Sequence, residues 1–258
     1  MITSIHNSKI QLVRSLLRRP KERREASAFV AEGVRLLEEA LSANWPFRFA
    51  LYGENLSARG NELIKRLQAE GIELEQVADT LLNSISDTET SQGLLAVLDD
   101  HLLPSPQPLS FALILDSIRD PGNLGTLLRT AAATGVQAVF LPPETTDAFA
   151  PKVVRAGMGA HFRLPILSLT WDEIRSRTHN LKIYLAEMEG AASCWEADFH
   201  TPLALIVGSE AEGASPAARE LASQSVYIPM PGETESLNAA VAGAILMFEV
   251  VRQRKTQQ

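Results

Sequence analysis

The stretch Ile228-Pro-Met-Pro-Gly-Glu-Thr-Glu-Ser-Leu-Asn-Ala-Ala-Val-Ala242 changes character abruptly along its length. A strand-like segment at residues 226–228 meets prolines and a glycine, which predict a loop. Ser236 and Asn238 then lead into residues 239–248, which have almost no polarity. Small polar side chains at a helix N-terminus, together with its backbone N–H groups, predict a site for a polar ligand. The alternative is that Ser236 only caps the last helix.

Apolar strands and helices alternate through the chain that precedes this loop. Six strands are predicted, at residues 111–115, 138–141, 163–166, 182–186, 203–207 and 226–228. Helices are predicted at residues 124–134, 151–156, 171–177, 217–221 and 237–251. This order predicts an α/β fold with a mostly parallel six-stranded sheet and helices on both faces. Ligands of such sheets bind beyond the carboxyl ends of the strands, so the loops after positions 115, 207 and 228 are the candidate sites.

A smaller α/β domain is predicted ahead of this sheet. Its helices are expected at residues 8–18, 34–41 and 63–70, and its strands at 29–31, 47–52 and 94–98. The prolines at 104, 106 and 108 then alternate in a pattern that favours extended, semi-rigid chain. We therefore predict an N-terminal domain over residues 1–98, a linker over 99–110 and a second domain over 111–258.

Length and composition are typical of a soluble globular protein. The chain has 258 residues, of which 45% are hydrophobic and 21% charged. Its longest apolar run, residues 239–248, is about half of the ~20 residues that a bilayer requires, and its start lacks the apolar core of a signal peptide. No membrane partner is therefore expected. The single cysteine, Cys194, fits a reducing compartment and a packing role, so we expect a cytoplasmic protein.

Charge is distributed unevenly along the chain. The net formal charge is −7 and the isoelectric point is about 5.3, which argues weakly against nucleic acid. Residues 1–35, however, hold eight basic and three acidic side chains, a net charge of +5 that leaves −12 on the remainder. A basic N-terminal segment on an otherwise acidic chain indicates that this segment contacts a polyanion. The alternative is that it forms a basic helix that is only exposed to solvent.

The first candidate loop lies within residues 116–130 and contains two glycines that allow a tight turn into a helix. Asn123 is expected just before that helix. Arg129 lies among apolar neighbours. It is either a surface arginine whose side chain extends over them toward solvent, or a fixed positive charge that binds a phosphate or stabilises a developing oxyanion. The loop has no GxGxxG and the chain no GxxxxGK[ST], so NAD and P-loop nucleotide sites are disfavoured.

The three loops become specific when they are taken in order. They read Asp-Pro-Gly-Asn-x-Gly-x-x-x-Arg-Thr-Ala, then Gly-Ser-Glu-x-x-Gly, then Ile-Pro-Met-x-Gly-x-x-x-Ser-Leu-Asn. Over residues 111–252 this resembles the SpoU (TrmH-type) RNA ribose 2′-O-methyltransferases of the SPOUT superfamily. The front part of the chain, including residues 29–41, resembles the small RNA substrate-binding domain attached to many rRNA-acting members. Ala211 and the pair Ala239-Ala240 depart from the usual family residues without removing a functional side chain.

The resemblance implies a deep trefoil knot in the C-terminal domain and a homodimer with its active site near the subunit interface. It implies S-adenosylmethionine as the cofactor and RNA, most plainly rRNA, as the substrate. Cofactor contacts are implied for five residues: Gly208, Ile228, Met230, Leu237 and Asn238. Catalytic roles are implied for Asn123, Arg129, Glu210, Ser236 and Asn238. No metal is expected, because the five histidines are scattered without ligand spacing.

Two questions stay open at this point: which group accepts the proton of the 2′-OH, and which RNA is the substrate. Arg129 is suited to stabilise an alkoxide, whereas its high pKa disfavours it as the base, so an RNA phosphate is the alternative proton acceptor. A tRNA methyltransferase, a drug-resistance rRNA methyltransferase and a non-catalytic RNA-binding or ribosome-assembly protein are the competing functions. The presence of all five polar motif residues favours an active enzyme.

Overall fold

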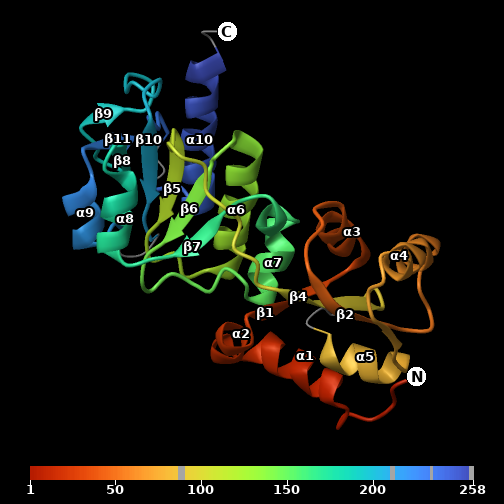
Figure 1. Cartoon of the computed structure of the whole chain (residues 1–258). Coiled ribbons are helices and arrows are strands. Elements are labelled where there is room, and N and C mark those ends of the chain that lie inside the picture. The colour runs from red at the N-terminus through yellow and green to blue at the C-terminus, as the bar shows by residue number, and fades with distance from the viewer. Residues whose placement is uncertain (87–90, 210–212, 233–234, 256–258) are drawn as a thin grey trace. The chain divides into compact units, whose positions relative to one another are not determined.

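The computed structural model describes residues 1–86, 91–209, 213–232 and 235–255, and Figure 1 follows the chain by colour. The chain divides into two compact units. The first unit comprises Met1–His101 and Phe149–Phe162, and the second comprises Leu102–Ala148 and Arg163–Gln258. The division after His101 falls within the predicted linker. The segment 149–162, which follows the linker in sequence, packs with the N-terminal unit.

The first unit is built on a four-stranded sheet of order β1-β4-β2-β3. Strand β4 is antiparallel to both β1 and β2, whereas β3 is parallel to β2. The strands are β1 (Ala28–Glu32), β2 (Phe47–Tyr52), β3 (Leu74–Gln76) and β4 (Leu94–Asp99). The helices are α1 (Ser8–Arg18), α2 (Pro20–Ala26), α3 (Val34–Ser42), α4 (Ala58–Ala69), α5 (Asp79–Ile85) and α7 (Pro151–Gly157), with a short 3-10 turn at Ala160–Phe162.

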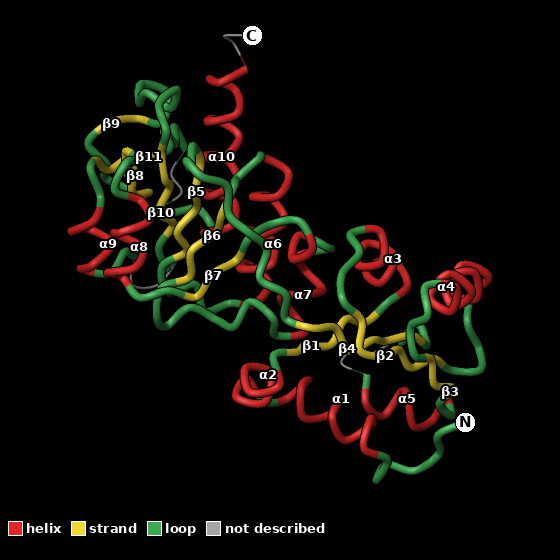
Figure 2. The backbone as a smooth tube through the Cα atoms, in the orientation of Figure 1, coloured by secondary structure: helices red, strands yellow, loops and turns green. Residues whose placement is uncertain are grey.

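Helices cover both faces of this sheet (Figure 2). On one face, Ile10 and Val13 of α1 and Leu82 of α5 join a buried cluster with Val30 and Val97 of the sheet. On the other face, helices α3 and α7 contact β1. The ring of Phe29 there lies 4.9 Å from that of Phe149 and 6.5 Å from that of Phe162. Segment 149–162 is therefore part of this unit's core.

Three elements of the first unit escaped the sequence analysis. Helix α2 is short and highly charged, with Pro20 at its first position, so it has no apolar periodicity to detect. Strand β3 has three half-buried residues, and α5 has seven residues. Elements this short owe their conformation to tertiary packing rather than to a local pattern.

The second unit contains a parallel sheet of order β7-β6-β5-β10-β8-β11-β9. Its strands are β5 (Phe111–Leu115), β6 (Ala138–Leu141), β7 (Ile166–Ser168), β8 (Lys182–Ala186), β9 (Ala192–Ser193), β10 (Leu203–Val207) and β11 (Gln224–Tyr227). Its helices are α6 (Pro121–Thr134), α8 (Trp171–Thr178), α9 (Pro216–Leu221) and α10 (Ala239–Lys255).

The prediction of six strands for this sheet is therefore wrong, because the described residues of the second unit form seven. The extra strand, β9, has only two residues and exists because it pairs with β11. The strand predicted at 163–166 begins instead at Ile166, because the chain just before it forms the 3-10 turn at Ala160–Phe162. Alternation along continuous apolar strands otherwise gave the α/β class correctly.

Helices lie on both sides of this sheet (Figure 1). Alternate residues of a strand point to opposite faces. Ile114 and Ile206 pack in a cluster with Ile174 of α8 and Ala218 of α9. On the other face, α10 crosses α6 and β10 closely at Gly243. A Cβ at Gly243 would lie 2.4 Å from Leu127 Cδ2, so this crossing requires a glycine or a shift of Leu127.

No helix within the described part of the chain is long and apolar enough to cross a membrane. Cys194 is fully buried, as a packing residue should be, and its burial raises the pKa of the thiol.

Candidate active site

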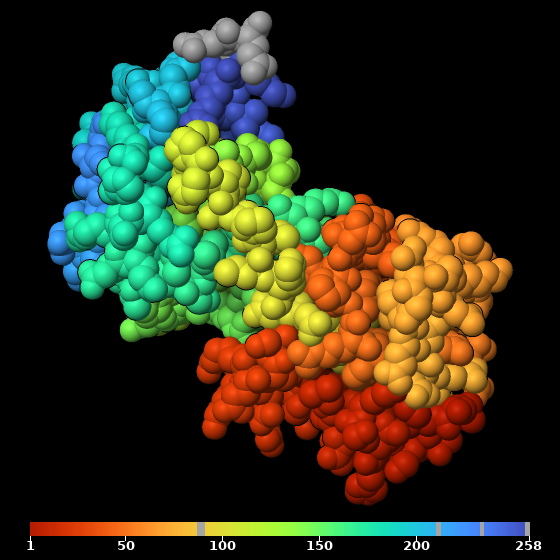
Figure 3. All heavy atoms as spheres, in the orientation of Figure 1, coloured from red at the N-terminus to blue at the C-terminus, as the bar shows by residue number. Residues whose placement is uncertain are grey.

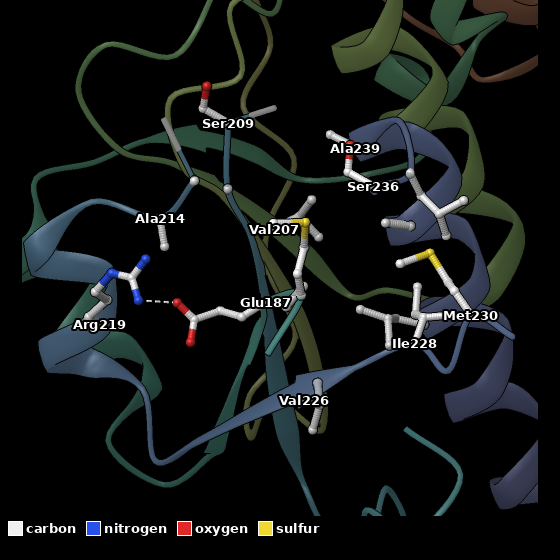
Figure 4. A pocket seen from close by; sticks show the side chains of 17 residues that line it. Glu187, Val207, Ser209, Ala214, Arg219, Val226, Ile228, Met230, Ser236 and Ala239 are labelled. Atoms are coloured by element: carbon white, nitrogen blue, oxygen red, sulfur yellow. Dashed lines mark hydrogen bonds and ion pairs between the residues drawn. The ribbon is translucent and has the colours of Figure 1, made fainter. Parts of the chain in front are cut away.

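A cavity of about 420 Å³ opens beyond the carboxyl ends of β8, β10 and β11 in the second unit. Figure 4 shows the side chains that line it. They come from the three strand ends, from helix α9 and from the start of α10. The lining residues are Ala186, Glu187, Met188, Val207, Gly208, Ser209, Gly213, Ala214, Arg219, Val226, Ile228, Met230, Ser236, Leu237, Ala239, Ala242 and Leu246. The volume lies in the range of small-molecule sites.

The lining is mostly apolar or glycine. Ser209 and Ser236 contribute hydroxyls, and among the described lining residues only Glu187 and Arg219 carry charge. Arg219 donates a hydrogen bond to the Glu187 carboxylate, and the side chains are 55% and 20% exposed. Apolar walls with a few fixed polar groups suit a ligand that has both an aromatic or aliphatic part and a polar part.

Backbone at Gly208 and Gly213 shapes one wall of the cavity. Ser209 and Gly213 exchange two backbone hydrogen bonds of 3.1 and 3.0 Å, which hold these two residues together directly after β10. A Cβ on Gly208 would lie 2.9 Å from the backbone N of Ala214 and from the carbonyl carbon and oxygen of Gly213. Position 208 therefore has no room for a side chain while the loop keeps this shape. The predicted catalytic residue Glu210 lies outside the described residues.

Asp116 holds the following turn in place. It comes directly after β5, is 1% exposed, and accepts a 2.6 Å hydrogen bond from the backbone N–H of Ser215. Ser117 Oγ donates to its other carboxylate oxygen at 3.2 Å. Because Ser215 follows the cavity residues Gly213 and Ala214, the buried carboxylate directly after β5 holds this wall of the pocket in place.

The loop that opened the sequence analysis supplies the opposite wall. Ile228, Met230, Ser236 and Leu237 all line the cavity. Ser236 does not cap the last helix by any described hydrogen bond. Asn238 does so instead, because its Oδ1 accepts from the N–H groups of residues 240 and 241 at 3.0 and 3.3 Å. The alternative that Ser236 caps the last helix is therefore wrong among the described hydrogen bonds, in which Asn238 is the cap.

Asn123 and Arg129 both lie on α6. Asp120 caps this helix at Asn123 N, so Asn123 belongs to the first helical turn rather than preceding it. Asn238 Nδ2 donates to Asn123 Oδ1 at 3.1 Å, which joins the first and third motif loops. Arg129 is exposed, does not line the cavity, and has no ion pair with a carboxylate within the described chain.

The structure thus gathers some predicted residues and separates others. Predicted residues from the second and third motifs line one cavity, and Asn123 and Asn238 form a bonded pair beside it. Arg129 stands apart on the surface of the same chain. The sequence analysis missed Asp116, Glu187 and Arg219. Asp116 follows a buried strand and so carried the same signal as the other strand-end residues, whereas nothing in the sequence pairs Glu187 with Arg219.

The described residues offer no set of side chains that could bind a metal ion. Among them there is no group of three or more His, Cys, Asp or Glu side chains placed to hold one. The cavity, with mostly apolar and glycine residues in its walls, instead suits a small organic molecule.

Comparisons with known proteins find relatives for both parts of the chain. Residues 110–248 match the SpoU rRNA Methylase family, and residues 7–96 match the MRM3-like substrate binding domain. The 23S rRNA (guanosine(2553)-2′-O)-methyltransferase RlmP of Bacillus subtilis is 32% identical over 96% of this chain and 98% of its own length.

Two solved structures with bound cofactor are also similar. The SpoU methyltransferase AviRb from Streptomyces viridochromogenes in complex with AdoMet has a TM-score of 0.84 at 29% identity, covering 97% of this chain and all of that one. The AdoMet-bound rRNA methyltransferase from Sinorhizobium meliloti has a TM-score of 0.84 at 31% identity, covering 97% of each chain.

Proposed function

Because this chain belongs to the SpoU rRNA methylase family, we propose that its cavity beyond β8, β10 and β11 binds the cofactor of an RNA methyltransferase. The protein is a S-adenosylmethionine-dependent enzyme that methylates a ribose 2′-OH of ribosomal RNA, as do relatives that align with nearly its whole length.

One observation supports the cofactor site above all. The second and third motif loops meet around a single cavity of about 420 Å³ whose backbone at Gly208 leaves no room for a Cβ. Gly208, Ile228, Met230 and Leu237 would hold S-adenosylmethionine there, the glycine by close backbone approach and the others by apolar contact. The bound cofactor supplies an activated methyl group.

Polar groups beside the cavity would handle the ribose. Asn123 and Asn238 are joined side chain to side chain at the N-termini of α6 and α10, and Ser236 presents its hydroxyl to the cavity. These three side chains would orient the ribose by hydrogen bonds, and Glu210, which lies outside the described residues, would join them. Alignment of the reacting atoms can contribute several kcal/mol to such a step.

Arg129 would stabilise the alkoxide that forms when the 2′-OH loses its proton. Its guanidinium is exposed and, within the described chain, is not neutralised by a carboxylate. A fixed cation lowers the energy of a developing oxyanion, while an RNA phosphate would accept the proton because arginine itself stays protonated. Because Arg129 does not line the cavity of its own chain, this role fits a site shared between two copies.

A homodimer would bring such a second copy. Val241, Ile245 and Phe248 form an exposed apolar stripe on α10, with 47%, 38% and 54% of their surfaces open to solvent. Their i, i+4, i+7 spacing puts them on one helix face. Helix α6, which carries Arg129, packs beside α10. A twofold interface on this stripe would cover it and place Arg129 near the partner's cavity.

A trefoil knot would account for the strand order. Strand β11 lies between β8 and β9, which are consecutive in the chain and joined by residues 187–191. That connection crosses β11 closely, because a Cβ on Gly190 would lie 2.5 Å from the carbonyl carbon of Val226 and Ala191 N donates to Ser225 Oγ at 3.0 Å. A later strand lying between two earlier, consecutive strands and close to their connection is the arrangement that supports a knot here.

The N-terminal unit would bind the RNA. Residues 1–35 contain eight basic side chains, of which Lys9 pairs with two glutamates and Arg23 is buried. Arg18 and Arg24, in contrast, are exposed and form no ion pair among the described residues. Helices α1 and α2 lie on an open surface of this unit, shown in red in Figure 3. Exposed arginines there would contact phosphates and position the RNA.

In this proposal residues 1–98 form the RNA-binding domain, 99–110 a linker and 111–258 the catalytic domain. Residues 149–162 of the catalytic domain pack within the first unit. The site of action would be the cytoplasm, which the lone buried Cys194 thiol suits.

Two measurements test the proposal. Calorimetric titration should detect binding of S-adenosylmethionine to the full chain, and a failure to bind would refute the cavity as a cofactor site. Mapping of ribose 2′-O-methyl groups in rRNA from cells with and without the gene should then reveal one missing mark. A complete set of marks without the gene would favour a non-catalytic RNA-binding role.

A further inference from the structure

The cavity contains a charged pair that the methyl transfer described above does not use. Glu187 follows β8 and its backbone N–H donates to Val226 O at 3.0 Å, which fixes its position at the strand end. Arg219, on α9, donates to its carboxylate. In Figure 4 this pair lies across the cavity from Ile228 and Met230. A carboxylate held at the wall of an otherwise apolar pocket is a candidate recognition group.

We infer that Glu187 recognises the two hydroxyls of the cofactor's ribose, and that Arg219 is the positioning residue that holds the carboxylate in place. This inference rests on the proposal that the cavity binds S-adenosylmethionine. A carboxylate has two oxygens and about four acceptor sites, so its bond from Arg219 leaves capacity for two neighbouring hydroxyl donors. A vicinal diol presents two donors at a spacing that one carboxylate spans, as acidic residues do for the ribose of other adenosine cofactors.

Charge favours the diol over the cationic groups of the cofactor. The ammonium or sulfonium group of the cofactor would have to lie beside the guanidinium of Arg219, which would repel it. That guanidinium already neutralises the charge of Glu187. Hydroxyls are neutral donors and meet no such repulsion. The arginine also approaches the second motif loop, since a Cβ on Gly213 would lie 3.7 Å from its Nη2. The pair therefore links the loop after β8 to the loop after β10 on one side of the pocket.

The folded protein should tolerate loss of the pair. Arg219 is more than half exposed, and ion pairs of that kind contribute little to stability. Substitutions should therefore act on the ligand rather than on the fold. Glu189 provides a matched control, because it lies two residues further along the same connection, is exposed and does not line the cavity.

The experiment measures binding rather than turnover. The full chain is titrated with S-adenosylhomocysteine and with its 2′,3′-dideoxy analogue, and the ratio of the two dissociation constants reports recognition of the hydroxyls. The wild type should bind the dideoxy analogue about ten-fold or more weakly, the loss expected for hydrogen bonds to a charged group. Glu187→Ala should weaken S-adenosylhomocysteine by a similar factor and bring the ratio close to one. Glu189→Ala should retain both wild-type values.

The remaining variants separate the outcomes. Arg219→Ala should lower the ratio partly and Arg219→Lys should restore some of it, which a purely structural role would not do. Should thermal melting show Glu187→Ala to be unfolded, the isosteric Glu187→Gln serves instead and should also reduce the ratio. An unchanged ratio in a folded Glu187 variant overturns the inference. If Gly208→Ala also binds S-adenosylhomocysteine as tightly as the wild type, the cavity itself is not the cofactor site.

Discussion

Asn238 Nδ2 donates a 3.1 Å hydrogen bond to Asn123 Oδ1, and this bond joins two loops that lie 115 residues apart in the sequence. Asn238 also caps α10 through its Oδ1. One side chain thus stabilises a helix with its oxygen and reaches the first motif with its nitrogen. Each function can be removed separately.

The bond between the two asparagines should matter for methyl transfer more than for folding. Asn238→Ser keeps an oxygen that can cap α10, so it should melt close to the wild type, but it loses the donor to Asn123. Its kcat/KM on rRNA should fall roughly ten-fold, the effect of about 1.4 kcal/mol. Asn238→Ala should in addition lose about 1 kcal/mol of stability. Additive effects of Asn123→Ala and Asn238→Ala on kcat/KM would argue against a working pair.

Arg129→Ala should abolish methyl transfer while leaving the affinity for S-adenosylmethionine within a few-fold. The guanidinium is placed outside the cavity, so its loss should spare the cofactor but remove the stabilisation of the alkoxide, a loss of about 10² to 10³ in kcat. Incorporation of labelled methyl groups into rRNA and calorimetry measure the two quantities. Arg177→Ala on α8 is the matched control and should behave as the wild type. Full turnover by Arg129→Ala would remove its proposed role.

Gly208→Ala should lose the cofactor. The new Cβ would lie 2.9 Å from backbone atoms of residues 213 and 214, so the loop after β10 must move away from the cavity that it lines. We expect the dissociation constant of S-adenosylmethionine to rise at least ten-fold, measured by calorimetry. Gly232→Ala is the control, because a Cβ there meets nothing within 4 Å. Equal affinities for the two variants would be inconsistent with this account of the pocket wall.

Phe248→Asp should convert a dimer into a monomer. The phenylalanine is 54% exposed in the single chain and completes the stripe with Val241 and Ile245, where a carboxylate would be buried without a partner in the dimer. Light scattering after gel filtration should give twice 28.1 kDa for the wild type and 28.1 kDa for the variant. Leu102→Asp, which alters an apolar residue elsewhere that is 63% exposed, should stay dimeric. A wild-type protein of 28.1 kDa would refute the dimer outright.

The pair of substitutions Arg18→Glu and Arg24→Glu should weaken rRNA binding in a salt-dependent way. Each lost phosphate contact should reduce the slope of log affinity against log salt by about one. Affinity for S-adenosylmethionine should not change. Lys65→Glu, on α4 of the same unit and exposed, makes the same change of charge as one of these substitutions and is the control. If it weakens rRNA as much as a single arginine change, the basic face of α1 and α2 is not the contact surface.

Sequence periodicity predicted long, regular elements best. The helix over residues 8–18 and the strands over 111–115 and 203–207 occur as predicted, because each buries one face or both faces of an apolar pattern. The pattern could not find α2, β3 or β9, which are short and held by their neighbours. For the site, the motif spacing supplied the residues at the strand ends, but it could not reveal that Arg219 pairs with Glu187 or that Asp116 holds Ser215.

By itself, the sequence determined the α/β class and predicted three candidate functional loops, because apolar periodicity and the residues of each motif are local properties of the chain. Only the tertiary structure decided which of those residues meet. The insertion of β11 between β8 and β9 brings the ends of β8, β10 and β11 around one cavity. The crossing of α6 and α10 brings Asn123 to Asn238 and leaves Arg129 outside. Strand order and helix crossing depend on contacts between segments distant in the chain, which no local pattern records.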